Sequence, residues 1–332
     1  MKKIIILLIL LLLIFNITDE IYQPVTFSQL LNNNSSREKP KLPAIIIMYD
    51  DGNIEDYTRA FPVHQEYGVP GVVAINPEYI GKKNKLDEGH LLLLEKNGWE
   101  ISNHGKFHAA LIYNSIINET KKGDKKLYVK NSSLVEPNYD YILFNSRKNI
   151  SETIEISEIK TDDRGKRYLK LDRPLENNYP LDKTYIRLSD KAMETEIVSS
   201  KSKFEQIGLE VNTFVYPYNG YIQPVKELVK DNYENARGGR KIGLDFPEAF
   251  VNTEPLEKYS LRGISFENHL LPEDRLQTLF KKTIKEKGLL IMYAHTQHDN
   301  FSEKRLEHII KTAQENNMDI ITFQDLDPAG EL

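Results

Sequence analysis

The stretch AIIIMYDDG at residues 44–52 constrains the fold more than any other part of the sequence. Its four leading apolar residues follow two prolines and predict a strand that is buried on both faces, as in a parallel sheet. The strand ends in two adjacent carboxylates, Asp50 and Asp51, followed by Gly52. In α/β folds, the chemistry lies at the carboxyl ends of the parallel strands. An Asp-Asp-Gly turn can also simply close a strand, so its meaning depends on the residues later in the chain.

Composition and charge exclude several classes of protein. The 332 residues carry a net charge of -5, and no basic stripe runs along the chain, which argues against binding to nucleic acid. The sequence contains no cysteine, so disulfides, thiolate metal sites and cysteine nucleophiles are all excluded. The length suits one large α/β domain with a smaller module.

The N-terminus predicts export from the cytoplasm. A basic head, Met1-Lys2-Lys3, precedes an apolar run of about a dozen residues, which is shorter than a spanning helix of roughly 20. We therefore interpret residues 1–18 as a signal peptide or N-terminal anchor and residues 19–43 as a linker. The protein is expected to be extracytoplasmic, either secreted or attached to a membrane through its N-terminal segment.

Strands and helices alternate on both sides of a central interruption. After the first strand, the pattern predicts a helix over 54–67, a strand over 69–75, a helix over 86–96 and a short strand over 99–102. The same rhythm resumes after residue 190 and continues to about residue 325. About seven buried strands favour a closed barrel over an open sheet. We therefore predict an α/β fold, a distorted (β/α)7 TIM-like barrel built from residues 44–117 and 191–325.

The interruption, residues 118–190, has a different pattern. Short segments that alternate between apolar and polar residues are separated by turn residues such as Asp162-Asp163-Arg164-Gly165. This predicts an inserted antiparallel β module. Within it, residues 152–175 are expected to form one hairpin.

Two histidines follow the strand predicted at 99–102. His104 and His108 stand at i and i+4, so they would share one face if the segment turned helically, as two ligands of one metal must. Such a pair is weak evidence by itself. Here it follows a strand that runs parallel to the one ending in Asp50-Asp51, so all four groups are expected at the same rim. The other histidines apart from His295 are expected on the surface or in loops: His64, His90, His269, His298 and His308.

Four motifs in order resemble those of the polysaccharide deacetylase family, the NodB-homology carbohydrate esterases. They are MYDDG at 48–52, HGKFH at 104–108, YPYNG at 216–220 and YAH at 293–295. Each follows or ends a predicted strand. The resemblance covers roughly residues 43–113 and 191–325, with the β module between them. Because no residue of the module matches a catalytic motif of the family, we expect the module to shape the glycan-binding groove or to dock the protein to the envelope, without being needed for bond cleavage.

The resemblance implies a role for each matched residue. Asp50 would be the general base that deprotonates a metal-bound water, and His295 the acid that protonates the departing amine. The backbone N–H of Tyr218 would stabilise the oxyanion. A divalent metal, with zinc as the expected ion, would be held by Asp51, His104 and His108.

The sequence departs from the family pattern at three places. Gly105 replaces the usual Ser or Thr, which removes a hydroxyl that steadies the metal loop. The Arg that tunes the base is missing near Tyr216, and Arg237 on the next strand is a candidate to supply it. The acid's usual Asp partner has no clear match, and Asp245 is the candidate.

The resemblance implies a metal-dependent hydrolase that removes N-acetyl groups from an envelope or extracellular polysaccharide. Two alternatives stay open: an O-acetyl esterase acting on a polysaccharide, and a catalytically weak glycan-binding envelope protein. Retention of the base, the three ligands and the acid favours an enzyme. The polymer itself is not defined, because the loops that form subsites vary freely on this fold.

Overall fold

Seven parallel strands close on one another to form a barrel in the computed structural model, which describes residues 41–239, 246–267 and 270–326. Each strand pairs in parallel with the next, and β15 completes the ring by pairing with β1. The predicted distorted (β/α)7 barrel is therefore confirmed. In ring order the strands are β1 (Ala44–Asp50), β2 (Val72–Ile75), β3 (Glu100–Asn103), β11 (Thr213–Val215), β12 (Asn235–Gly239), β14 (Leu261–Ser265) and β15 (Leu289–Ala294).

The apolar run at the start of β1 is buried on both faces, as its sequence predicts. Ile45, Ile47 and Tyr49 belong to the larger apolar core, which includes residues from the surrounding helices. The alternate side chains of β1 join a second, smaller cluster with residues of the other barrel strands and with Phe323 near the C-terminus. Two covered faces leave β1 no solvated side, which is why its sequence is continuously apolar rather than alternating.

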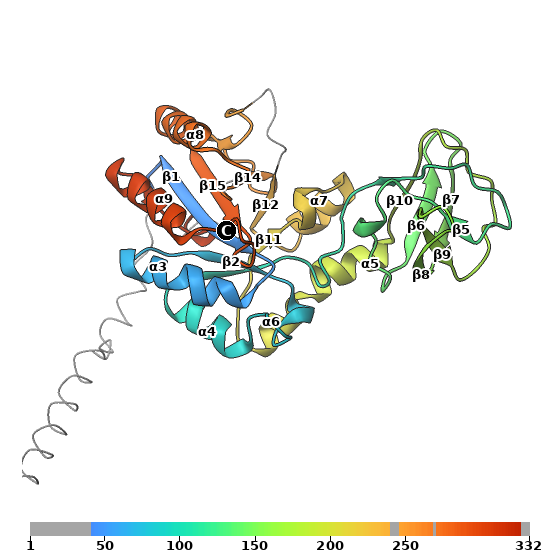
Figure 1. Ribbon diagram of the computed structural model, residues 1–332, viewed down its shortest axis with the longest axis horizontal. Helices are drawn as coiled ribbons and strands as arrows, with labels where there is room; N and C mark the ends of the chain where they lie inside the picture. The colour runs from blue at the N-terminus through green and yellow to red at the C-terminus, as the bar shows by residue number, and fades with distance from the viewer. Residues whose placement is uncertain (1–40, 240–245, 268–269, 327–332) are drawn as a thin grey trace, which may run out of the picture. The chain divides into compact units, whose positions relative to one another are not determined.

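Helices pack around the barrel strands (Figure 1). The helix predicted over 54–67 is split into a wider helical segment, Asp56–Ala60, and α3, and it ends at Gly68 with φ +62°, a left-handed cap that favours glycine. Helix α4 begins with a capping box at Asp87 and His90. The helices are α3 (Phe61–Tyr67), α4 (Glu88–Lys96), α5 (Asp190–Glu194), α6 (Lys201–Gln206), α7 (Gln223–Lys230), α8 (Glu273–Glu286) and α9 (Glu303–Glu315).

Two short strands extend the barrel sheet. β13 (Val251–Asn252) pairs antiparallel with β15, and β16 (Asp319–Ile320) runs parallel to β1. Within the part of the chain that the structure describes, every helix is too short or too polar to cross a bilayer. The predicted signal or anchor at residues 1–18 lies outside the described residues, as does most of the predicted linker.

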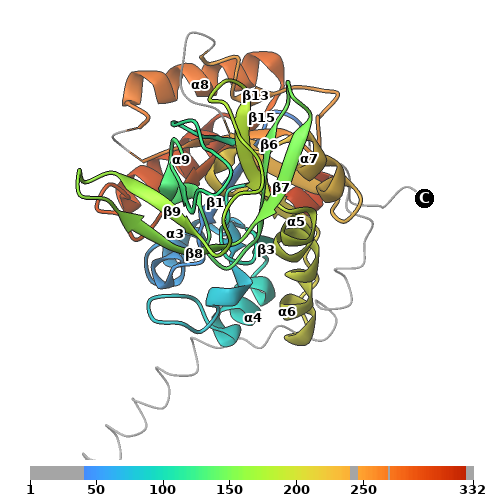
Figure 2. The ribbon, with the colours of Figure 1, turned by 90° about the vertical axis from the view of Figure 1, so that its right-hand side faces the viewer.

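Between β3 and β11 the chain forms two antiparallel sheets, seen in green in Figure 2. The expected hairpin over 152–175 is only partly right, because residues 150–154 pair with β6 while the hairpin itself joins β8 to β9. Barrel and insert lie in one compact unit. One sheet contains β4 (Asn114–Ser115), β10 (Thr184–Leu188), β6 (Tyr141–Asn145) and β7 (Ile150–Ile154); the other contains β5 (Lys126–Leu127), β9 (Arg167–Leu171) and β8 (Ile156–Thr161).

Candidate active site

Three of the predicted site residues come together at the carboxyl ends of β1 and β3. One ligand atom from each of Asp51, His104 and His108 lies within 4.8 Å of the others. The Asp51 Oδ1 atom is 3.6 Å from His104 Nε2 and 3.5 Å from His108 Nε2. One carboxylate and two imidazoles that converge in this way fit the ligand set of a catalytic zinc site, which keeps positions open for water and substrate.

The two imidazoles are held in the form that binds metal. The Nδ1 atom of His104 lies 2.8 Å from the carbonyl oxygen of Val215, so Nδ1 carries the hydrogen and Nε2 presents its lone pair toward Asp51. Burial lowers the pKa of His104. Burial and the neighbouring His104 lower the pKa of His108 to about 4. Both rings are therefore neutral at physiological pH, as a metal ligand must be.

A loop, rather than the predicted helical turn, brings the two histidines together. Gly105 and His108 have left-handed backbone, with φ of +78° and +61°. The side-chain amide of Asn76 donates to the carbonyl oxygens of His104 and Gly105, at 2.6 and 2.9 Å. Left-handed backbone at a residue with a side chain stores strain that is typical of functional sites. The i, i+4 spacing therefore identified two histidines that converge, although the segment between them is a loop and not a helical turn.

Asp51 is also positioned by left-handed backbone and by a side chain that donates to a main-chain carbonyl oxygen. Its φ is +77°, and its carbonyl oxygen accepts a hydrogen bond of 2.8 Å from Lys85 Nζ. Asp tolerates left-handed backbone better than most residues. Because the chain turns sharply here, Asp50 and Asp51 can serve different functions although they are adjacent.

Asp50 lies at the end of β1, buried beside Arg237 of β12. The two side chains form a close ion pair between Asp50 Oδ1 and Arg237 Nη2. Burial alone would raise the pKa of Asp50, but Arg237, with smaller contributions from His104 and His295, holds it below its ordinary value. The arginine that is absent near Tyr216 is thus supplied by the neighbouring strand, as proposed from the sequence.

His295 follows β15 and is paired with a residue that the sequence analysis missed. The Oε1 atom of Glu267 lies 3.1 Å from His295 Nδ1 and also accepts a bond of 3.0 Å from the backbone N–H of His295. Burial would lower the pKa of His295, but the hydrogen bond to Glu267 and the charges of Asp50 and Asp51 raise it to about 9. The candidate partner Asp245 lies outside the described residues.

Glu267 stays ionised in this pair. Burial opposes its charge, but hydrogen bonds from His295 lower the pKa of Glu267 to about 2. The half-exposed His298 also reaches it, with Nδ1 3.3 Å from Oε1. Glu267 follows β14, which neighbours β15 in the ring, so its place after a strand end was the signal that could have found it.

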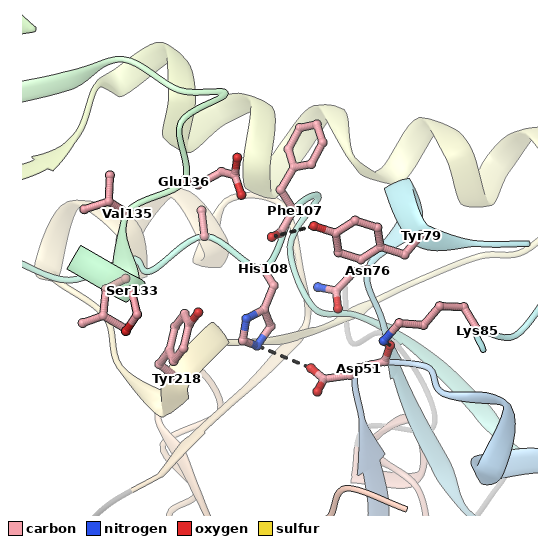
Figure 3. A pocket seen from close by; sticks show the side chains of 12 residues that line it. Asp51, Asn76, Tyr79, Lys85, Phe107, His108, Ser133, Val135, Glu136 and Tyr218 are labelled. Atoms are coloured by element: carbon pink, nitrogen blue, oxygen red, sulfur yellow. Dashed lines mark hydrogen bonds and ion pairs between the residues drawn. The ribbon is translucent and has the colours of Figure 1, made fainter. Parts of the chain in front are cut away.

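Tyr218 lies beside the ligand set. Its ring is 4.6 Å from that of His108 between centroids, and its backbone is left-handed, with φ +55°. A pocket of about 330 Å³ opens next to these residues (Figure 3). The inserted module supplies one wall of it. The pocket is lined by Asp51, Asn76, Tyr79, Lys85, Phe107, His108, Ala109, Ser133, Leu134, Val135, Glu136 and Tyr218.

One of the remaining histidines is not where the sequence analysis expected it. His64 is fully buried, with Nε2 2.7 Å from the hydroxyl of Tyr49 and Nδ1 2.9 Å from the carbonyl oxygen of Pro70. Burial lowers the pKa of His64 to about 4, so it is a neutral core residue. His269 lies outside the described residues.

Comparison with known proteins confirms the predicted resemblance. Residues 37–152 are similar to the family model described as polysaccharide deacetylase. The matched region includes Asp50, Asp51, His104 and His108.

Individual relatives are distant. A putative polysaccharide deacetylase, YxkH from Bacillus subtilis (strain 168), is 28% identical over 93 residues, which are 28% of this chain and 33% of that protein. The match thus spans about a third of the relative's length. Similar solved structures include the Xyl-CE4 domain of a multidomain xylanase from the hindgut metagenome of Trinervitermes trinervoides, with 12% identity, a TM-score of 0.46 and coverage of 86% of this chain and 89% of that one. The peptidoglycan deacetylase PdaC from Bacillus subtilis has 12% identity, a TM-score of 0.42 and coverage of 87% and 92%.

Proposed function

We propose that the protein is a metal-dependent N-deacetylase of an envelope or extracellular polysaccharide. The single observation that carries this proposal is the arrangement at the barrel rim. Two imidazoles and one carboxylate converge there, from His104, His108 and Asp51. Beside them lie Asp50, which is kept ionised, and His295, which is kept protonated.

The ligand set fits a divalent cation in donor type and in protonation state. Asp51, His104 and His108 would hold it. When bound, an ion such as zinc would supply a Lewis acid that polarises the acyl carbonyl and lowers the pKa of a water molecule. The other steps belong to the side chains of this protein.

Asp50 is suited to take a proton from the attacking water. Its carboxylate is ionised at neutral pH and is fixed by Arg237, so it need not reorganise when the proton arrives. The backbone N–H of Tyr218, in the turn that packs on His108, is suited to donate to the oxyanion.

His295 is suited to give a proton to the leaving group. Its Nδ1–H is committed to Glu267, which leaves the Nε2–H to donate. A pKa of about 9 keeps the ring protonated at neutral pH. An amine is a poor leaving group unless it is protonated as the C–N bond breaks. An acid that is protonated at neutral pH therefore favours amide over ester cleavage.

The decisive experiment measures acetate released from matched panels of N-acetylated and O-acetylated oligosaccharides. Protein stripped with a chelator should be inactive and should recover when Zn²⁺ is added. A His104→Ala, His108→Ala double mutant should contain no metal by elemental analysis. Stoichiometric metal in that double mutant would show that the ligand assignment is wrong.

The same panel separates the alternatives. Release from O-acetylated substrates only would make the protein an esterase. Tight glycan binding with no release by the metal-loaded protein would make it a binding protein.

Export belongs to this proposal as well. It rests on the basic and apolar pattern of residues 1–18. The full chain should appear in the membrane fraction or the medium, and a chain lacking residues 2–18 should stay inside the cell.

A further inference from the structure

Glu196 is a buried carboxylate that the proposed chemistry does not use. It lies between α5 and α6, and its side chain is 0% exposed. It neither lines the pocket nor belongs to the ligand set. A carboxylate buried this deeply is tolerated only if hydrogen bonds replace its lost water.

Those hydrogen bonds come from the loop that carries His108. The backbone N–H of Phe107 donates to Oε2 at 3.0 Å, and that of Ala109 donates to Oε1 at 2.7 Å. The two donors flank His108 on either side. The backbone N–H of Lys106 also donates to the main-chain oxygen of Glu196, at 3.0 Å. Glu196 therefore holds the backbone of this ligand from both directions.

Glu196 also explains why residue 105 is a glycine. A Cβ atom at Gly105 would lie 2.5 Å from Glu196 Oε1, closer than real contacts allow. The Ser or Thr that is usual at this position in the family has no room here. The carboxylate occupies the space and supplies the hydrogen bonds that steady the loop.

The remaining donor comes from the inserted module. The hydroxyl of Tyr139 donates to Glu196 Oε2 at 2.7 Å, and the Tyr139 ring packs edge-on against Phe107, with centroids 5.5 Å apart. Tyr139 follows closely after the pocket wall formed by residues 133–136. Hydrogen bonds thus connect the module, through Glu196, to the backbone on both sides of His108.

We propose that Glu196 is a positioning residue that links the inserted module to the metal-ligand loop, so that the module sets the metal affinity of the site. The inference rests on the proposed function, because it requires that the site binds metal. It differs from the expectation that the module is separate from the chemistry.

The test measures Zn²⁺ affinity of the full chain by competition with a chromophoric chelator, without any substrate. Residues that orient a ligand typically contribute about 10–100-fold to metal affinity. Glu196→Gln should weaken Zn²⁺ binding within that range. Tyr139→Phe, which keeps the carboxylate, should weaken it by roughly threefold to tenfold, since one of its supporting hydrogen bonds is lost.

Tyr128→Phe is the matched control. Tyr128 also belongs to the module and also donates to a carboxylate, with its hydroxyl 2.9 Å from Asp162 Oδ2, but its ring packs against Tyr168 of β9 instead of the ligand loop. This variant should bind Zn²⁺ like the wild type. Circular dichroism and thermal unfolding identify variants that fail to fold.

Two failures are distinguishable. If the wild type binds Zn²⁺ and a folded Tyr139→Phe binds it equally well, the link between module and site is wrong while the proposed function stands. If the wild type does not bind Zn²⁺, the proposed metal-dependent function fails, and this inference fails with it.

Discussion

At the barrel rim Asp50 is paired with Arg237, and His295, which follows the strand next to that of Asp50, is paired with Glu267. Both pairs place an ionisable group at a strand end and hold it with an opposite charge from another part of the barrel. Glu267 follows β14, which pairs with β15, whereas Arg237 lies on β12, which does not adjoin β1. Burial opposes the charge of Asp50 and of His295 alike. In both cases the charge of the partner outweighs the effect of burial, so Asp50 remains ionised and His295 remains protonated at neutral pH.

The two pairs differ in the other contacts that hold Arg237 and Glu267 in place. Arg237 donates to Asp50 and also to Asn219 and stacks over Tyr293, so it is fixed by three neighbours. Glu267 accepts from His295 and also interacts with the half-exposed His298. Both partners are buried, but the partner of the proposed base has only buried or part-buried contacts, whereas the partner of the proposed acid also interacts with a half-exposed histidine. Substitutions of the four paired residues test this comparison.

Asp50→Asn should have the largest effect. It removes the proton acceptor without removing a metal ligand, so acetate release should fall by about 10²–10⁴-fold. Metal content by elemental analysis should stay at the wild-type value. A rate near that of the wild type would contradict the assignment of Asp50 as the base.

His295→Gln should come next, and its effect should depend on the substrate. Release from an N-acetylated sugar should fall by about 10²-fold or more, because the amine must be protonated to leave. Hydrolysis of an activated aryl acetate should fall much less, because its leaving group needs no proton. Equal losses on both substrates would indicate that His295 only maintains the structure.

Glu267→Gln should change the pH profile more than the maximal rate. His295 must be protonated to act, so activity should be lost as the pH rises through about 9 in the wild type. Without the carboxylate, burial is opposed less strongly, and the basic limb should move down toward the ordinary histidine pKa of about 6.5 or below. An unchanged basic limb would mean that it reports another group.

Arg237→Lys should have the smallest effect, on the opposite limb. Lysine keeps the charge but cannot hold Asp50 and Asn219 with one planar fork. The pKa of Asp50 should rise, so the acidic limb of the rate profile should move up by about one unit. The basic limb should stay in place, which provides the internal control.

The sequence predicted the parts of the site that depend on local order along the chain. Asp50 and Asp51 stand at the end of the apolar strand β1, His104 and His108 follow the buried strand β3, and parallel strands bring their ends to one rim. Arg237 could be proposed because it sits on the strand after Tyr216. The closed barrel followed from the number of buried strands.

The missed residues are defined by tertiary contacts, for which the sequence offered only indirect signals. Glu267 meets His295 only because β14 and β15 are neighbours in the closed ring. Glu196 lies in a helical region and meets the ligand loop from 87 or more positions away in the sequence. Gly105 was an indirect signal for Glu196, because the missing side chain at position 105 leaves the space that the Glu196 carboxylate occupies.

The contact between β3 and β11, which closes the barrel across the inserted module, has consequences for folding. β3 and β11 meet in register only at Asn103 and Phe214, about 110 residues apart in the sequence, with the module between them. Once β10 pairs with β4 through Ile186 and Asn114, the chain to be closed shortens to about 40 residues. That lowers the entropy cost of closure by about 1 kcal/mol, or roughly fivefold in rate if closure limits folding. We therefore expect the insert to fold first and to bring β3 and β11 close together. Replacing it with an unstructured linker of equal length should make the barrel fold more slowly.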